Sequence, residues 1–233
     1  MEILFEDNQI IVVKKPQNVP SQADSSGDED MLSLVKEYIK EKYNKPGNVF
    51  VGLVHRLDRP TGGVMVFAKT SKAASRLSAQ IQDGTMEKQY LCVTCGTPRE
   101  KMAHLTHYIK KDEKNNMVEI VPQSTEGAKK AELEYKVLAT SGNYSLLSVK
   151  IFTGRSHQIR VQLKSIGCPI YGDQKYGGEH SPKANLNLFA TELRFIHPVS
   201  KTKMVFKVYP PETENAWKLF NIDQFLRVSK IDN

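Results

Sequence analysis

His55-Arg56-Leu57-Asp58-Arg59-Pro60-Thr61-Gly62-Gly63 is the stretch on which the prediction of this chain's fold and function depends. It places one carboxylate, Asp58, between two arginines, in a segment whose Pro-Thr-Gly-Gly end favours a turn. Apolar residues lie on both sides, at 50–54 and 64–67. We therefore expect a charged loop between two buried strands, a common way to hold a catalytic group rigidly. The flanking cations would keep Asp58 ionised. An ordinary Arg–Asp surface turn fits this stretch about equally well.

The chain is basic overall, but its first part is acidic. Its 33 Lys and Arg residues outnumber 26 Asp and Glu residues, giving a formal net charge of +7. Residues 1–35 carry seven acids and two lysines, a balance of −5, so the remainder carries +12. A basic body of this kind indicates a polyanionic partner, although a lysine-rich solvated surface has the same composition.

Neither export nor membrane insertion is indicated. No apolar run approaches the roughly 20 residues of a membrane span, and the start of the chain lacks the basic-then-apolar order of a signal peptide. Three cysteines, an odd number, argue against a disulfide framework. We therefore expect a cytoplasmic protein.

Strand patterns outnumber helix patterns along the chain. Strands are expected at 3–5, 10–13, 89–93, 103–109, 118–121, 131–139, 144–152, 187–195 and 203–208. Helices are expected at 31–43, 71–83, 156–166 and 212–225, the third opened by Ser156 and ended at Gly167. The turn at 141–143 predicts a hairpin. These elements predict an α+β fold with a largely antiparallel sheet.

A second polar segment, Thr153-Gly154-Arg155-Ser156-His157-Gln158-Ile159-Arg160-Val161-Gln162-Leu163, joins a strand end to a helix start. Arg160 and Lys164 share one face of that helix, beside an apolar stripe of Ile159, Leu163 and Ile166. An arginine in this position can reach an anion on another segment. Solvation of the helix is the alternative, but the density of Arg, His and Gln favours a polar site.

These segments and several others resemble the RluA type of pseudouridine synthase, the family that isomerises uridine in structured RNA. In chain order, the matching motifs are Ile11–Pro16, His55–Gly63, Glu87–Tyr90, Thr153–Leu163, Pro169–Gly177 and Leu188–Pro198. Several long motifs in the right order are highly specific, whereas each alone is only suggestive. The resemblance implies one pseudouridine synthase catalytic domain over residues 1–233, with a curved, mainly antiparallel mixed sheet flanked by helices and loops.

The same resemblance assigns the site. It implies that Asp58 is the catalytic aspartate, attacking the ribose or assisting the loss of a ribose proton. Arg160 is implied to pair with Asp58, and Tyr90 to stack on the target uracil. Arg56 is the candidate to fill the gap left by the extruded nucleotide. The remaining substrate-binding residues by resemblance are His55, Thr61 and Leu163.

The implied reaction requires neither a cofactor nor a metal, since isomerisation involves no redox change and no external group donor. The implied partner is structured RNA, ribosomal or transfer, whose phosphates the lysines would contact. We expect no membrane association, no obligatory protein partner and a monomer. Because the chain begins almost at its first motif, we expect it to lack the small S4-like amino-terminal module of many relatives. Thr61-Gly62-Gly63 departs from the usual Thr-Ser-Gly by a lost hydroxyl and added backbone freedom.

Three other interpretations remain open. Cys92 and Cys95, with His104 and His107, suggest a metal site, but residues three apart on a strand face opposite sides. Buried strand thiols are therefore the favoured explanation. A glycoside hydrolase would require a facing carboxylate pair, which the acids near Asp58 do not form in sequence. A catalytically silent RNA-binding protein fits the basic body, but has no evident need of the aspartate.

Overall fold

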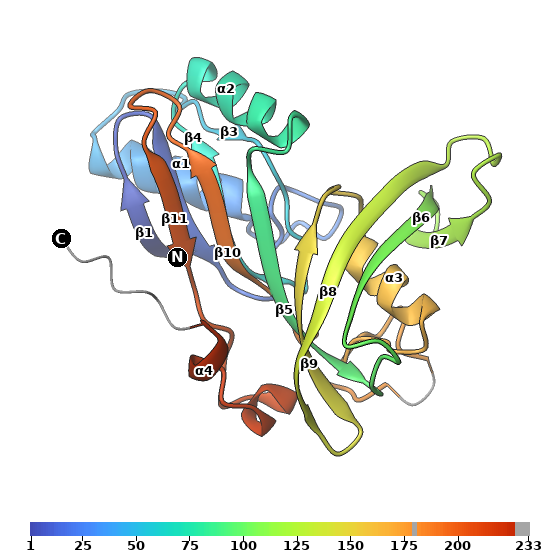
Figure 1. Cartoon of the computed structure of the whole chain (residues 1–233). Helices are drawn as coiled ribbons and strands as arrows, with labels where there is room; N and C mark the ends of the chain where they lie inside the picture. The colour runs from blue at the N-terminus through green and yellow to red at the C-terminus, as the bar shows by residue number, and fades with distance from the viewer. Residues whose placement is uncertain (179–180, 227–233) are drawn as a thin grey trace. The chain divides into compact units, whose positions relative to one another are not determined.

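The computed structural model describes residues 1–178 and 181–226, and the contacts of the chain group it into two compact units (Figure 1). Unit 1 comprises Met1–Lys88 and Ala190–Val208. Unit 2 comprises Gln89–Phe189 and the chain from Tyr209 onward. The single catalytic domain over residues 1–233 stays a prediction.

Unit 1 is built around two antiparallel strands that are almost completely buried. Its elements are β1 (Glu2–Glu6), β2 (Ile10–Lys15), α1 (Met31–Lys42), β3 (Gly52–Leu53), β4 (Gly62–Ala68), α2 (Ser71–Gln82), most of β10 (Leu188–Ile196) and β11 (Lys203–Lys207). The strand order is β1-β2-β4-β10, with β3 also paired to β4 and β11 to β10. β2 and β4 pair along their length, and every residue of β4 is buried. Their near-continuous apolar runs are typical of strands covered on both faces.

The two predicted helices of unit 1 are confirmed, and side-chain caps fix their starts. The Asp30 carboxylate accepts the Ser33 N–H at 3.1 Å to begin α1. The Thr70 hydroxyl accepts the Ala73 N–H at 3.1 Å to begin α2. Such caps satisfy backbone donors that a helix start otherwise leaves without partners. Ala73 and Leu77 are the fully buried residues of α2.

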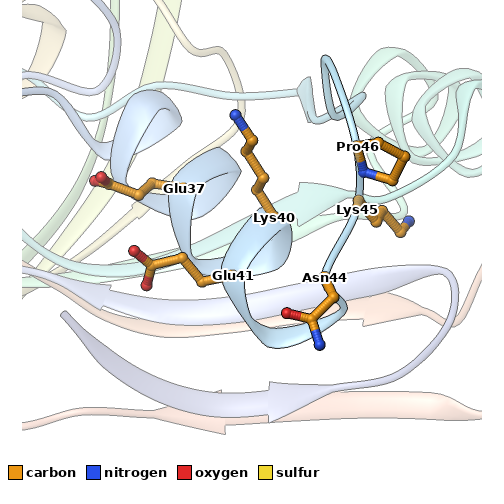
Figure 2. A pocket seen from close by; sticks show the side chains of 6 residues that line it. All are labelled: Glu37, Lys40, Glu41, Asn44, Lys45 and Pro46. Atoms are coloured by element: carbon orange, nitrogen blue, oxygen red, sulfur yellow. The ribbon is translucent and has the colours of Figure 1, made fainter.

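A shallow hollow lies at the carboxy-terminal end of α1 (Figure 2). It is lined by Glu37, Lys40, Glu41, Asn44, Lys45 and Pro46. The lining balances two carboxylates against two ammonium groups and contains none of the predicted site residues. This hollow is therefore no part of the predicted site.

Unit 2 is an antiparallel arrangement of long strands with one principal helix. Its elements are β5 (Glu87–Cys95, which starts in the last residues of unit 1), β6 (Met102–Asp112), β7 (Met117–Val121), β8 (Lys129–Ser141), β9 (Tyr144–Ile151), α3 (Gln158–Ser165), the 3-10 helix η1 (Asn215–Leu219) and α4 (Asp223–Leu226). The strand order is β5-β9-β8-β6-β7. The hairpin predicted at 141–143 joins β8 to β9 and is confirmed. Together with unit 1, these mostly antiparallel strands and few helices confirm the α+β class.

The continuous helix predicted at 212–225 is wrong. The chain instead forms η1 and α4, separated by Phe220 in an extended conformation (φ −131°, ψ 141°). Trp217 and Ile222 are both fully buried. Five residues apart, they would point about 140° away from each other on one helix. Burial of both side chains therefore favours the break.

Candidate active site

The loop that carries Asp58 joins β3 to β4, and hydrogen bonds hold its backbone on several sides. The Thr61 N–H donates to the Asp58 carbonyl at 2.9 Å and closes the predicted turn. The buried Ser21 hydroxyl donates to the Leu57 carbonyl at 2.7 Å and accepts the Leu57 N–H at 3.1 Å. The Gln17 amide donates to the Pro60 carbonyl at 3.0 Å. The expected buried strand before the loop is, however, only the two half-buried residues of β3, whereas β4 is fully buried.

Lys15 is completely buried at the end of β2, and its side chain is hydrogen-bonded to the backbone of this loop. Its ammonium group donates to the Arg59 carbonyl at 3.0 Å and to the Pro16 carbonyl at 2.9 Å. Burial lowers the pKa of Lys15 to about 7, and the negative charge of Asp58 partly opposes that shift. The charges of Lys15 and the half-buried Asp58 therefore interact within this loop.

His55 ties the loop to the neighbouring strand. Its Nε2 accepts the Val66 N–H of β4 at 3.1 Å, so the proton of the neutral ring lies on Nδ1. Burial first, and the charge of Lys88 second, hold the pKa of His55 well below its usual value. Among the described residues, neither His55 Nδ1 nor the buried Thr61 hydroxyl has a hydrogen-bond partner. Both residues belong to the predicted substrate-binding set.

The two arginines beside Asp58 have different surroundings. Arg59 forms ion pairs with Asp28 and, at 3.6 Å, with Asp24, and it donates to the Ser26 hydroxyl at 2.8 Å. Arg56 is exposed. Asp24 and Asp28, from the acidic first 35 residues, therefore pair with Arg59, whereas Arg56 remains exposed.

Gly63 is required by the local geometry. Its φ is +135°, and a Cβ built on it would lie 2.3 Å from the carbonyl oxygen of Ala190 in β10. Both the left-handed backbone and the close approach exclude a side chain. The last glycine of the motif thus allows the chain to pass from the loop into β4 directly against β10.

The helix that carries Arg160 begins later than expected. α3 starts at Gln158, and the residue at the cap position is His157 in a left-handed conformation (φ 51°), not Ser156. The Gln158 side chain closes the preceding turn, because its oxygen accepts the Arg155 N–H at 3.1 Å and the Thr153 hydroxyl at 2.7 Å. The prediction of Ser156 as the cap is wrong for this reason. Gly167, in a left-handed conformation, follows the end of the helix as expected.

Arg160 is buried and forms a bidentate ion pair with Asp173. Arg160 Nε and Nη2 lie 2.8 and 2.7 Å from the two carboxylate oxygens. The fully buried Asp173 carboxylate also accepts the Lys175 and Tyr176 N–H groups, each at 3.0 Å. A buried ion pair of this kind requires all of these contacts to offset desolvation. The predicted pairing of Arg160 with Asp58 concerns residues of different units and stays a prediction.

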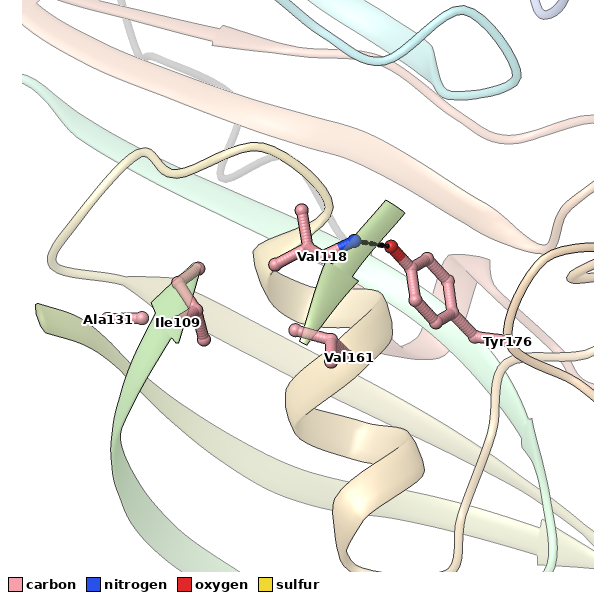
Figure 3. Close-up of a cluster of buried hydrophobic side chains, with 5 residues drawn as sticks. All are labelled: Ile109, Val118, Ala131, Val161 and Tyr176. Atoms are coloured by element: carbon pink, nitrogen blue, oxygen red, sulfur yellow. Dashed lines mark hydrogen bonds between the residues drawn. The ribbon is translucent and has the colours of Figure 1, made fainter. Parts of the chain in front are cut away.

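Tyr176 completes this arrangement in unit 2 (Figure 3). The Arg160 guanidinium lies 5.0 Å from the centre of the Tyr176 ring. The Tyr176 hydroxyl accepts the Val118 N–H at 2.8 Å and lies 2.8 Å from His157 Nδ1. Asp173 and Tyr176 lie in the motif Pro169–Gly177, but the sequence alone assigned neither residue a role. The sequence signal that could have pointed to Asp173 is the pair Gly172-Asp173, a glycine typical of a turn followed by an acid. The structure confirms the turn, since Gly172 has a φ of +75°.

The remaining predicted residues lie within elements of unit 2. Tyr90 is in β5 and only 6% exposed, and Leu163 is fully buried on the inner side of α3. Their predicted contacts with substrate stay predictions.

The favoured explanation for the thiols of the alternative metal site, burial within a strand, is confirmed for Cys92 and only in part for Cys95. Cys92 is buried within β5, and burial raises its pKa. Cys95 is half-buried, whereas His104 is exposed. Within residues 1–178 and 181–226, no three His, Cys, Asp or Glu side chains form a group able to hold a metal ion. The same ranges contain no helix that is both long and apolar enough to cross a membrane.

Comparisons with known proteins agree on one family. The family model described as RNA pseudouridylate synthase matches residues 9–165. An uncharacterized RNA pseudouridine synthase of Aquifex aeolicus is 37% identical over 230 residues, covering 91% of this chain and 70% of the relative. Ribosomal large subunit pseudouridine synthase D of Borreliella burgdorferi is 35% identical over 222 residues, covering 94% of this chain and 67% of the relative.

Solved structures show the same fold. Human RNA Pseudouridylate Synthase Domain Containing 4 superimposes with a TM-score of 0.75 at 22% identity, covering 91% of this chain and 89% of the other. Human RNA Pseudouridylate Synthase Domain Containing 1 gives 0.71 at 22% identity, covering 98% and 95%. From its sequence relatives, its matched family model and this shared fold, the chain belongs to the RluA type of RNA pseudouridine synthases and is an isomerase that modifies RNA.

Proposed function

We propose that this enzyme converts specific uridines of structured ribosomal RNA to pseudouridine, with Asp58 as the catalytic group and without a cofactor. The observation that carries the proposal is the Asp58 loop, whose backbone is fixed by Thr61, Ser21 and the buried Lys15. Relatives in Borreliella burgdorferi and Zymomonas mobilis, 35% and 31% identical, are named ribosomal large subunit pseudouridine synthase D. Their name supports ribosomal RNA over transfer RNA as the substrate.

The reaction moves the ribose C1′ from N1 to C5 of the same uracil. The N1–C1′ bond breaks, the base turns, and the C5–C1′ bond forms, while C5 loses its proton and N1 gains one. Asp58 either attacks the ribose covalently or assists the loss of a ribose proton, and both roles require an ionised carboxylate.

The target nucleotide has to leave its stack to reach Asp58, which costs a few kcal/mol. Arg56 is exposed and can insert its guanidinium plane into the vacated position. In the same loop, the Thr61 hydroxyl and the His55 Nδ1–H are buried without a hydrogen-bond partner among the described residues, and the family resemblance assigns both residues to the nucleotide. Tyr90 stacks on the uracil, and Arg160 orients Asp58 in this proposal.

The test is tritium release from ribosomal and transfer RNA labelled at uridine C5. Wild-type protein should release tritium from unmodified ribosomal RNA. Asp58→Asn and Asp58→Ala should lower the rate by at least about 10³-fold, because each removes the anion without changing the fixed backbone. RNA binding by both variants should remain within a few-fold of wild type.

The matched control is Asp83→Asn, which changes an exposed aspartate at the end of α2 whose side chain accepts the Thr85 N–H. An asparagine oxygen can accept the same bond, so this variant should release tritium at the wild-type rate. Substantial turnover by Asp58→Ala would contradict the role of Asp58. Release from transfer RNA alone would contradict the proposed substrate.

A further inference from the structure

One face of the β6–β8–β9 sheet in unit 2 is covered and the other is open to solvent. On the covered face, α3 packs against a cluster that includes Ile109, Ala131 and Val161 (Figure 3). The strand register places alternate residues on the opposite face: His104 of β6 lies beside Glu134 of β8, which lies beside Lys150 of β9. Two residues before His104 on β6, Met102 lies beside Lys136 of β8. We call this second surface the open sheet face; it includes Met102, His104, Lys130, Lys136, Lys150 and Phe152.

The open sheet face carries aromatic and apolar groups that the fold does not bury. Phe152, directly after β9, is 50% exposed, and Met102 is 61% exposed. The rings of Phe152 and His104 are paired, with their centres 5.3 Å apart and their planes inclined by 37°. The Phe152 backbone N–H donates to the Glu132 carbonyl at 2.9 Å, so its position beside β8 is fixed. The chain thus holds two neighbouring rings in place at a solvent-exposed surface.

Cations lie around this ring pair, and the Glu132 carboxylate lies 3.7 Å from His104 Nε2. The Lys150 ammonium lies 5.7 Å from the centre of the Phe152 ring. Lys130 and Lys136 are exposed on β8, and Arg155 donates to the Lys130 carbonyl at 3.2 Å. The face also contains two acids, Glu132 and Glu134, of which Glu132 is paired with Lys130 at 2.8 Å. Its net charge is therefore positive.

We propose that the open sheet face binds a single-stranded segment of the RNA substrate, with bases stacked on Phe152 and His104 and phosphates contacted by Lys130, Lys136 and Lys150. This inference rests on RNA being the substrate, as proposed above. Aromatic side chains on an open sheet, flanked by lysines, are the combination that binds unpaired bases, because every base has a face that can stack. A duplex presents no such free faces along its length.

The charge of the face argues against a protein occupant. Protein interfaces are depleted of lysine and glutamate at their centre, whereas here those residues surround the aromatic pair on the same strands. The cations instead complement a phosphate backbone. The occupant is therefore RNA rather than another protein or a second copy of this chain.

The first experiment measures binding of a fluorescein-labelled oligouridine of about 12 nucleotides by fluorescence anisotropy. Phe152→Ala should weaken binding by about 10-fold, which corresponds to the loss of one stacked base, while Phe152→Trp should bind as tightly as wild type. Phe50→Ala is the matched control, because Phe50 is 51% exposed but belongs to unit 1 and is not one of the residues of this face. It should bind within two-fold of wild type. Thermal melting of each variant verifies that it is folded.

The second experiment replaces uridine by 5-iodouridine in the same oligonucleotide and maps the photocross-links. Trypsin releases Phe152 in the peptide Ile151–Arg155 and His104 in Met102–Lys110. Cross-links in these peptides would support the site. Cross-links confined to other peptides, or a Phe152→Ala variant that loses no more affinity than Phe50→Ala, would overturn it.

The test separates this inference from the proposed function. Tritium release by wild type, combined with unchanged oligouridine binding by Phe152→Ala, contradicts only the binding site. Absence of release, combined with the 10-fold loss of binding, contradicts only the proposed reaction. A change in the sedimentation of the RNA-free protein on Phe152→Ala substitution would mark the face as a self-association surface and also overturn the proposal.

Discussion

Lys15 shows how single residues determine the setting of the Asp58 loop. A strand-end lysine adjoining Lys14 in sequence has the pattern of a surface residue, yet its side chain is completely buried and bonded to the Arg59 carbonyl. A lysine that remains buried needs carbonyl partners and a nearby anion, and the loop supplies both. The motif Ile11–Pro16 and the motif His55–Gly63 are thus joined by the hydrogen bond from Lys15 to the Arg59 carbonyl.

The titration of Lys15 should make folding stability depend on pH. Burial lowers its pKa to about 7 in the folded state from 10.5, so between these values the unfolded chain binds more protons. Stability therefore rises with pH across this window, by about 2 kcal/mol between pH 7 and 9. Lys15→Met should remove this rise, as measured by urea denaturation at both pH values.

Lys14→Met is the control for this prediction, because Lys14 neighbours Lys15 but keeps its side chain one-third exposed beside Glu2. It should retain the wild-type rise in stability. Identical pH profiles for wild type and Lys15→Met would show that Lys15 does not titrate in this range.

At the scale of elements, α3 is a short helix held mainly by tertiary contacts. Eight residues are marginal as an isolated helix. The turn before it is closed by the Gln158 side chain, and its inner side rests on β6 and β8 through Ile109, Ala131 and Val161. The hydroxyl of Tyr176, from a separate loop, joins His157 at the helix start to Val118 in β7. The position of Arg160 therefore depends on residues far from it in sequence.

Tyr176→Phe should destabilise the protein by about 2 kcal/mol, because it leaves the buried Val118 N–H and His157 Nδ1 without their partner. The measurement is the free energy of unfolding from urea denaturation. Tyr171→Phe is the matched control, since Tyr171 is half-buried and packs its ring edge-on against Tyr144 at 5.5 Å. We expect this control to change stability by less than about 0.5 kcal/mol. Equal effects of the two substitutions would refute the bridging role of the Tyr176 hydroxyl.

At the scale of the whole molecule, charge is distributed unevenly. The acids of the first 35 residues are partly used internally, since Asp24 and Asp28 engage Arg59, while the rest of the chain carries the positive excess. This distribution leaves cations available for a phosphate backbone.

Binding of ribosomal RNA should therefore weaken steeply with salt. Each phosphate contact adds about 0.9 to the slope of log affinity against log salt, so four contacts would weaken binding roughly 100-fold between 50 and 200 mM. Filter binding across this range measures the slope. Lys136→Gln should reduce it by about 0.7 if the open sheet face contacts a phosphate of single-stranded RNA. A flat salt profile for wild type would contradict phosphate-driven binding.

Much of this protein is determined locally by its sequence. Alternating residues predict the β6, β8 and β9 strands, Asp30 and Thr70 mark the starts of α1 and α2, and ordered motifs identify the family. These features depend on periodicity, capping and turn preferences within a few residues, which a single sequence displays directly.

Other features were decided only by tertiary structure. Examples are the complete burial of Lys15, the Arg160–Asp173 ion pair, the cap position of His157 and the break at Phe220. Each depends on which segments pack together: a carbonyl from the Asp58 loop, a carboxylate from the loop after α3, or two side chains that need burial on different sides. Local periodicity contains no information about such partners, because burial and ion pairing are set by neighbours in space rather than along the chain.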